Sequence, residues 1–350
     1  MSRPTEIVAD PVPAAALARW LAAEVPEVAV ASGAVTVEKI AGGHSNLTYR
    51  IVDDAGAAWA LRRPPTGGVL ATAHDMSRER RYVSALHPTG VPVARPVAYG
   101  ADPGVSGAEF YLMEFVGGTV LGDREAGEAY PRESRRAAGL AVVDVLAGLH
   151  SLDPAAVGLG DLHRPGSYLE RQLRRWHRQV HASAVEDLSV VDAAHDRLTA
   201  LLPRDERVGI AHGDYRAGNL SFTPDGRIAA VFDWELATIG DPLADLGWLL
   251  MSWARPGDTV PAGVAGPSEL PGFPERDELV ARYGEGTGSH PDPGLVDYYV
   301  AFARWRSACI GAGVYSRYVA GVMGATDADT STWLAKVQAQ AAAALDSLAG

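Results

Sequence analysis

The spacing of apolar residues changes along the chain from a helical period to a period of two and back again. Residues 11–25 carry apolar side chains at helical spacing, and Pro26 ends this first predicted helix. From Val35 the period becomes two, which predicts an antiparallel meander of strands around 35–37, 47–51 and 58–62. The pattern then predicts a helix over 76–86 and a further strand over 110–115. The N-terminal part of the chain is therefore expected to form a small β-rich lobe.

Beyond Gly117 and Gly118 the pattern is mainly helical. Helical spacing is found in the segments 131–149, 168–180, 193–202, 242–253, 296–318 and 330–348. The two glycines predict a joint near 114–118, between an N-terminal domain of residues 1–116 and a helical domain of residues 117–350. The stretch 254–294, rich in Pro and Gly, predicts a long surface loop. The expected fold class is α+β, with a small antiparallel sheet lobe before a larger, mainly helical lobe.

Composition and charge limit the functions that this chain can have. Its 350 residues include 31 Lys and Arg against 43 Asp and Glu, so the formal net charge is −12. Such an acidic surface repels a phosphate backbone and argues against a general nucleic-acid-binding protein. The single cysteine, Cys309, cannot form an internal disulfide and has apolar neighbours that indicate burial. We find no signal peptide and no apolar stretch long enough to span a membrane, and therefore expect a cytoplasmic protein.

The segment 208–235 contains the strongest candidate chemistry. Asp214 follows a short apolar run, Asn219 lies five residues later, and Asp233 ends a second apolar run. The turn sequence Pro-Asp-Gly at 224–226 predicts a hairpin that places Asn219 next to Asp233. Their oxygens suit Mg²⁺, and Asp214 is then placed to accept a proton from a hydroxyl that attacks a metal-held phosphate. Taken singly, each residue also fits a structural role, but the set at this spacing favours chemistry.

The predicted sheet lobe offers two means of holding a phosphate donor. The turn with Gly42, Gly43 and Ser45 could present backbone N–H groups and a hydroxyl to phosphate oxygens, although the glycines taken alone favour a plain turn.

The strand at 58–62 offers the second means of holding a phosphate donor. Ala60 and Arg62 share a face because strand side chains repeat every two residues, so a small residue would lie against a flat base while a guanidinium reaches the phosphates. Glu79 on the following helix is the expected carboxylate partner of Arg62. The alternative is that the charged residues at 78–81 form only a solvated helix face.

Three motifs in order give this chain a resemblance to a known family. HGDYRAGN at 212–219 resembles the catalytic loop of the aminoglycoside phosphotransferase and choline kinase-like family, which shares the protein-kinase fold. FDWELATIGDPLADLGWL at 232–249 resembles its metal-binding segment, and YLMEFVGG at 111–118 its hinge. Other segments are similar to the branch fused to acyl-CoA dehydrogenases, and the resemblance extends over about Ile40 to Gly321. It implies a bilobal protein-kinase-like fold.

The resemblance also implies roles for individual residues. Asp214 would be the catalytic base, Asn219 and Asp233 the Mg²⁺ ligands, and Glu235 a water-mediated metal contact. The adenine would meet the residues of the hinge, namely Met113 and the backbone of Glu114 and Val116. His212 would hold the loop by hydrogen bonds, and Asp245 would brace it. Arg62 stands where many relatives have a phosphate-binding Lys, which leaves the geometry at the α- and β-phosphates open.

These observations lead to the hypothesis of a small-molecule kinase that uses ATP or GTP and Mg²⁺ and phosphorylates an alcohol. The acceptor stays open between a hydroxyacyl compound, which the acyl-CoA dehydrogenase branch favours, and an aminocyclitol. Two alternatives remain: a non-catalytic nucleotide-binding module and a metal-dependent phosphohydrolase that uses the same carboxylates. The sequence indicates neither a nucleic-acid nor a membrane partner, and the oligomeric state cannot be read from it.

Two further groups of residues invite a functional interpretation but are first read as structural. His177 and His181 form an H-x-x-x-H pair on a predicted helix. Because no Cys or third His lies close in sequence, a solvated basic helix face is favoured over a zinc site. Trp176, Trp248 and Trp253 lie in largely apolar surroundings and are expected to be core residues.

Overall fold

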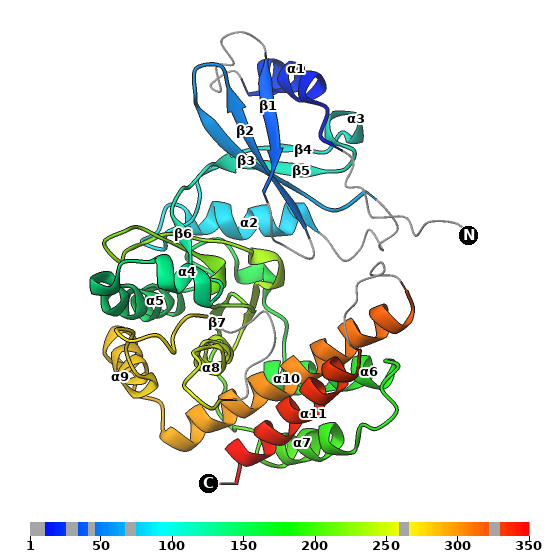
Figure 1. Cartoon of the computed structure of the whole chain (residues 1–350), viewed down its shortest axis with the longest axis vertical. Helices are drawn as coiled ribbons and strands as arrows, with labels where there is room; N and C mark the ends of the chain where they lie inside the picture. The colour runs from blue at the N-terminus through cyan, green and yellow to red at the C-terminus, as the bar shows by residue number, and fades with distance from the viewer. Residues whose placement is uncertain are drawn as a thin grey trace. The chain divides into compact units, whose positions relative to one another are not determined.

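The computed structural model describes residues 11–25, 34–40, 46–66, 75–258, 266–321 and 330–349, which form two compact units (Figure 1). The sheet unit comprises residues 5–117 and the short segment 230–235. The helical unit comprises residues 118–229 and 236–350. The segment 230–235 thus packs in the sheet unit although more than a hundred residues separate it in sequence from the rest of that unit.

The sheet unit is built on a five-stranded antiparallel sheet. Across the sheet the strands are β1 (Val35–Lys39), β2 (Leu47–Asp53), β3 (Ala58–Arg63), β5 (Phe110–Glu114) and β4 (Pro96–Gly100). Its helices are α1 (Ala14–Glu24), α2 (Met76–Leu86) and α3 (Pro103–Ser106).

Strand β3 illustrates how the period of two builds this unit. Leu61 is buried in one apolar cluster with Leu17 of α1, whereas Ala60 is buried in a second cluster with Met76 of α2. Because neighbouring side chains point to opposite faces, the sheet contributes to an apolar cluster on each side. The face that carries Ala60 also carries Arg62, as the alternation predicts.

The helical unit contains most of the remaining chain. Its helices are α4 (Arg124–Ala129), α5 (Arg135–His150), α6 (Tyr168–His181), α7 (Ser189–Ala200), α8 (Leu243–Ser252), α9 (Arg276–Thr287), α10 (Pro293–Val319) and α11 (Thr330–Ser347). Its short strands are β6 (Thr119–Val120), β7 (Gly209–Ala211), β8 (Leu220–Phe222) and β10 (Thr238–Gly240), and β9 (Ile228–Val231) runs from this unit into the sheet unit. Short 3₁₀ turns occupy Arg132–Ser134, Gly160–Leu162, Ala217–Asn219 and Trp234–Leu236.

Helix α8 lies in the core of the helical unit, and all of its residues are buried. It packs against α10. Gly247 of α8 comes so close to Tyr299 of α10 that a Cβ atom on Gly247 would lie 2.3 Å from the Tyr299 carbonyl oxygen. Cys309 of α10 is also buried, as expected, and burial raises the pKa of its thiol. None of the described helices combines the length and apolarity that a membrane crossing needs.

The region 254–294 differs from the predicted long loop, because it contains α9. Glu275 and Glu278 form a capping box at the start of this helix, and Leu279 and Tyr283 are buried on its inner face. The Pro and Gly residues around α9 made the sequence pattern of the whole stretch irregular, and the helix signal of α9 itself was confined to a few positions.

Candidate active site

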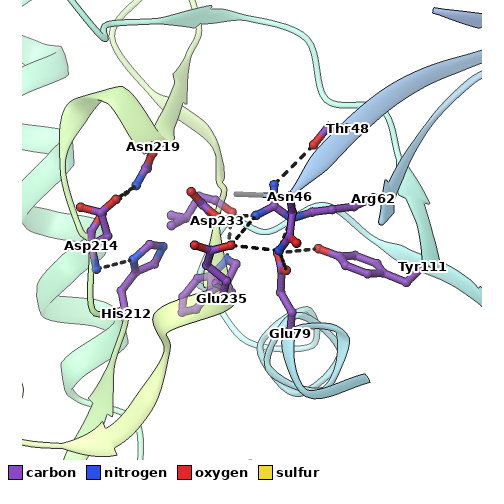
Figure 2. A network of polar contacts seen from close by, with 12 residues as sticks. Asn46, Thr48, Arg62, Glu79, Tyr111, His212, Asp214, Asn219, Asp233 and Glu235 are labelled. Carbon is purple, nitrogen blue, oxygen red and sulfur yellow. Dashed lines mark hydrogen bonds and ion pairs between the residues drawn. The ribbon is translucent and has the colours of Figure 1, made fainter. Parts of the chain in front are cut away.

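The residues singled out in the sequence fall into two groups, one in each unit (Figure 2). Arg62, Glu79, Asp233 and Glu235 belong to the sheet unit, and Asp214 and Asn219 to the helical unit. Three further candidates, Gly42, Gly43 and Ser45, lie outside the described residues.

Arg62 is the centre of the group in the sheet unit. Its Nε lies 2.7 Å from Oε1 of Glu79, and its side chain is only 11% exposed. Its terminal Nη2 donates to Oδ1 of Asp233 and lies 3.6 Å from Oε2 of Glu235. Its Nη1 donates to the Thr48 hydroxyl at 3.4 Å. The guanidinium therefore contacts several groups at once, which its fork-shaped set of donors permits.

Glu79 of α2 is buried and has further partners. Tyr111 of β5 donates its hydroxyl to Oε1 of Glu79 at 3.0 Å. Asn46, which precedes β2, donates Nδ2 to Oε2 of Glu235 at 2.9 Å and lies 3.4 Å from Oε2 of Glu79. The sequence analysis missed both residues. The period of two along β5 would have placed Tyr111 on the face of Met113, while Asn46 has no comparable local signal.

The charges in this group explain the direction of the Arg62 pKa. Burial alone would lower the pKa of Arg62, but the charges of Glu79 and Asp233 raise it above its ordinary value. Three carboxylates, those of Glu79, Asp233 and Glu235, lie around the Arg62 guanidinium, and a second guanidinium, that of Arg78, donates to the Glu235 backbone carbonyl at 3.3 Å. Carboxylate oxygens gathered in this number suit a divalent cation such as Mg²⁺.

Asp233 has an unusual backbone conformation. Its φ is 67°, the only positive φ of a non-glycine residue in the described parts of the chain. Asp is one of the residues that tolerate this region, at a cost of about 1–3 kcal/mol. The preceding strand is fixed to the sheet unit by the Val231 N–H, which donates to the Pro92 carbonyl at 2.8 Å. The chain thus turns sharply at Asp233 and directs the carboxylate at Arg62.

The predicted adenine contacts lie at the end of β5. Met113 pairs in register with Ala60 of β3, and both are buried in one cluster with the partly buried Val116. The Glu114 side chain is 53% exposed, and its backbone N–H donates to the Arg95 carbonyl at 2.9 Å. Their role toward a nucleotide stays a prediction.

In the helical unit, the loop after β7 is held by Asp245 of α8. Its Oδ2 accepts the His212 backbone N–H at 2.5 Å, and its Oδ1 accepts the Gly213 N–H at 2.8 Å. Gly213 has a φ of 86°, and a Cβ atom there would lie 2.6 Å from the Leu236 carbonyl oxygen, so this position requires glycine. His212 is buried and accepts the Asp214 N–H on Nδ1 at 3.2 Å.

Asp245 should therefore be critical for stability. Burial opposes its ionisation, but a hydrogen bond from His150 and the backbone donors outweigh it and lower the pKa of Asp245. We expect Asp245→Asn to lower the free energy of unfolding by about 3 kcal/mol, because an amide NH₂ would face backbone donors.

The effect should depend on pH. Because the folded pKa is depressed, the ionised Asp245 stabilises the protein above about pH 4, and this contribution is lost as the pH falls through the folded pKa. Urea unfolding at several pH values should show the variant and the wild type converging in acid. The exposed Asp205, changed to Asn, is the control. An equal loss for both variants would contradict the role of Asp245.

Asp214 itself is held by three side chains. Asn219 donates Nδ2 to Oδ2 of Asp214 at 2.8 Å and also to its backbone carbonyl at 2.8 Å. Trp248 of α8 donates Nε1 to Oδ1 at 2.6 Å, and Arg216 Nε lies 3.5 Å from the same oxygen. With both amide hydrogens of Asn219 directed at Asp214, its Oδ1 is the atom suited to a cation.

Trp248 was expected to be a core residue, and it is buried, but its indole N–H reaches the candidate base. The guanidinium carbon of Arg306 of α10 lies 4.6 Å from the centre of the Trp248 ring. The same guanidinium donates to the Gly213 carbonyl at 2.5 Å. Trp253, by comparison, donates only to the Pro274 carbonyl. Trp248 lies within the motif at 232–249 and Trp253 lies outside it, but the hydrogen bond to Asp214 depends on packing between separate segments.

The model of the phosphotransferase enzyme family, APH, matches residues 36–294. The chain belongs to this family. The predicted family resemblance is therefore confirmed.

Solved structures agree with this assignment to the APH family. A candidate aminoglycoside phosphotransferase from Ralstonia eutropha is 31% identical, with a TM-score of 0.78 over 95% of this chain and 97% of that one. A choline/ethanolamine kinase family protein from Mesorhizobium loti has a TM-score of 0.61 at 19% identity, over 94% of each chain. The latter shows the fold alone, and together they confirm the predicted bilobal, protein-kinase-like α+β fold.

The curated relatives are longer proteins. Human acyl-CoA dehydrogenase family member 11 is 35% identical over 292 residues, which is 82% of this chain and 37% of that protein. The chicken protein of the same name is 34% identical over 298 residues, which is 83% of this chain and 38% of that protein. The chain thus spans little more than a third of the length of these relatives.

Proposed function

We propose that this APH-family chain is an ATP- and Mg²⁺-dependent phosphotransferase that phosphorylates a hydroxyl group of a small molecule. The observation that carries the proposal is the buried Arg62, which is paired with Glu79 and bonded to Asp233 in a group that holds three carboxylates. A guanidinium that can hold phosphate oxygens beside carboxylates that attract a divalent cation suits a metal–nucleotide complex.

In this proposal each residue has one task. Arg62 binds phosphate oxygens of the donor, and Glu79 fixes its position. Asn219 and Asp233 provide oxygens for Mg²⁺, with Glu235 contacting it through water. When bound, Mg²⁺ would neutralise charge on the phosphates.

Asp214 acts on the acceptor. One carboxylate oxygen accepts the proton of the acceptor hydroxyl as the hydroxyl oxygen attacks the γ-phosphorus and the bond to the leaving ADP oxygen breaks. Asn219 and Trp248 hold the carboxylate in place through their donors. The remaining predicted contacts, from Met113, Glu114, Val116 and Ala60, would hold the adenine, and Gly42, Gly43 and Ser45 the phosphates.

For the acceptor we propose a hydroxyacyl compound in preference to an aminocyclitol. The support is the set of curated relatives, whose names are those of acyl-CoA dehydrogenase family members. A panel of hydroxyacyl acids and their CoA esters, with an aminoglycoside panel beside it, separates the two classes. Phosphorylation of aminoglycosides alone would contradict this choice of acceptor.

The function is tested with nucleotide binding and transfer measured separately. The wild type should bind ATP in a Mg²⁺-dependent manner and transfer phosphate to a panel member, whereas Asp233→Ala should lose the Mg²⁺ dependence of binding. Binding without transfer to any acceptor would favour a nucleotide-binding module instead. Hydrolysis of phosphoesters without ATP would favour a phosphohydrolase.

Trp248 provides a prediction about positioning. We expect Trp248→Phe to lower kcat about tenfold and to change KM for ATP less than about twofold, because it removes a hydrogen bond to a charged group worth about 1.5–3 kcal/mol. Trp253→Phe is the matched control, since it removes an equally buried indole N–H that does not reach Asp214. Similar losses in the two variants would show that kcat responds to packing and not to this hydrogen bond.

A further inference from the structure

A second cluster of ligand-type side chains lies in the helical unit, on α6 and α7. His177 and His181 of α6 and Asp192 of α7 bring three possible ligand atoms within 4.8 Å of one another. The Nε2 atoms of His177 and His181 lie 3.0 and 2.8 Å from the same Oδ1 of Asp192. The two Nε2 atoms are 3.1 Å apart. The structure thus supplies the third ligand that the sequence pattern around the H-x-x-x-H pair lacked.

The spacing of these atoms suits one face of a tetrahedral metal site. Ligand atoms bound to zinc at about 2.0–2.1 Å are about 3.3 Å apart in a tetrahedron. The observed separations of 2.8–3.1 Å need to widen by only a few tenths of an ångström to reach that value. The side chains are 32%, 45% and 39% exposed, so the fourth position faces water.

The surroundings fix one of the rings. The His195 ring stacks on that of His177, with centroids 4.0 Å apart and an angle of 19° between the planes. Its Nδ1 lies 3.2 Å from Oδ1 of Asp196. The stacked contact restricts the orientation of the His177 ring.

We propose that His177, His181 and Asp192 bind a divalent transition-metal ion of the zinc type. Two imidazoles and one carboxylate favour zinc over magnesium, which prefers a shell of oxygen ligands. None of these three residues is among the proposed Mg²⁺ ligands, Asn219 and Asp233. Because it joins α6 to α7 across the connection at 182–188, the bound ion would stabilise this pair of helices.

The experiment uses an untagged full-length chain that has been stripped with chelator and kept in excess Mg²⁺. Zn²⁺ titration by calorimetry should show one equivalent bound per chain, and the melting temperature should rise with Zn²⁺. Co²⁺ should bind at the same place and give visible absorption bands. His181→Gln and Asp192→Asn should each weaken Zn²⁺ binding at least about 100-fold. The exposed His163, changed to Gln, is the matched control and should bind as the wild type does.

Either of two outcomes would overturn the proposal. No binding at micromolar Zn²⁺, or binding that both His181→Gln and Asp192→Asn leave unchanged, would show that the cluster is only a hydrogen-bonded group. Circular dichroism in the presence of chelator shows whether each variant is folded. If one of the two variants is not folded, His177→Gln is measured in its place. ATP binding with Mg²⁺ is measured in parallel, so a failure of this proposal is distinguishable from a failure of the proposed kinase function.

Discussion

Asp214→Asn should lower kcat for phosphotransfer about 10³-fold while KM for ATP changes less than about twofold. General-base catalysis contributes about 10²–10⁴-fold, and an amide cannot accept the proton of the acceptor hydroxyl. The three side chains that contact the carboxylate, those of Asn219, Trp248 and Arg216, all offer donors. The amide group of an asparagine would face at least one of these donors, so we expect an additional loss of about 1 kcal/mol in stability. Steady-state kinetics with the best acceptor of the panel, together with urea unfolding, measures both effects.

Asp225 offers the matched control for this prediction. Its carboxylate is exposed at the turn after β8, where it pairs with Arg227. Asp225→Asn makes the same chemical change in the turn between β8 and β9 and should leave kcat within about twofold, since surface pairs contribute little. If Asp214→Asn retained most of the wild-type kcat while the control behaved as expected, Asp214 would not be the base.

Arg62→Met should lower the free energy of unfolding by about 3–5 kcal/mol and abolish productive binding of ATP. Removing one partner of a buried pair leaves the other charge uncompensated, and Glu79 is only 1% exposed. Asp233 and Glu235 would also lose a nearby positive charge. Chemical denaturation of the full chain and equilibrium nucleotide binding are the two measurements.

A double variant separates the charge effect from lost packing. In Arg62→Met with Glu79→Met, most of the stability should return, because well-packed apolar groups often replace a buried ion pair without loss. Nucleotide binding should stay absent, because the guanidinium is missing in both variants. The control is Arg50→Met on β2, whose exposed pair with Glu38 should contribute less than about 1 kcal/mol. A double variant no more stable than Arg62→Met would contradict an electrostatic cause.

The contacts of Arg62 explain why a lysine would not serve equally well at this position. Its three nitrogens have separate partners, in Glu79, Asp233 and Thr48. A lysine has a single nitrogen at the end of a flexible chain and could not keep all three contacts in this geometry. The surrounding side chains therefore accommodate an arginine where the family resemblance led us to expect a lysine.

Much of the fold was readable from local patterns. The helix at 76–86 was predicted with the bounds that α2 has, and the period of two placed Ala60 and Arg62 on one face of β3. The turn at 224–226 was marked by its own residues, and the Thr223 N–H does donate to the Arg227 carbonyl at 2.9 Å. Helix α9 was missed because proline and glycine dominate the composition around a short capping signal.

The sequence alone thus determined the family motifs, the strand faces and most helices, since each depends on residues within a few positions of one another. Tertiary structure alone decided that Trp248 reaches Asp214, that Tyr111 supports Glu79, and that Asp192 completes the histidine pair. Trp248 and Asp214 are 34 positions apart in sequence, and Tyr111 and Glu79 are 32 positions apart. Asp192 lies 15 and 11 positions after the two histidines. Periodicity records which way a side chain points from its own element. The partner it meets depends on how separate elements pack, and no local spacing encodes that.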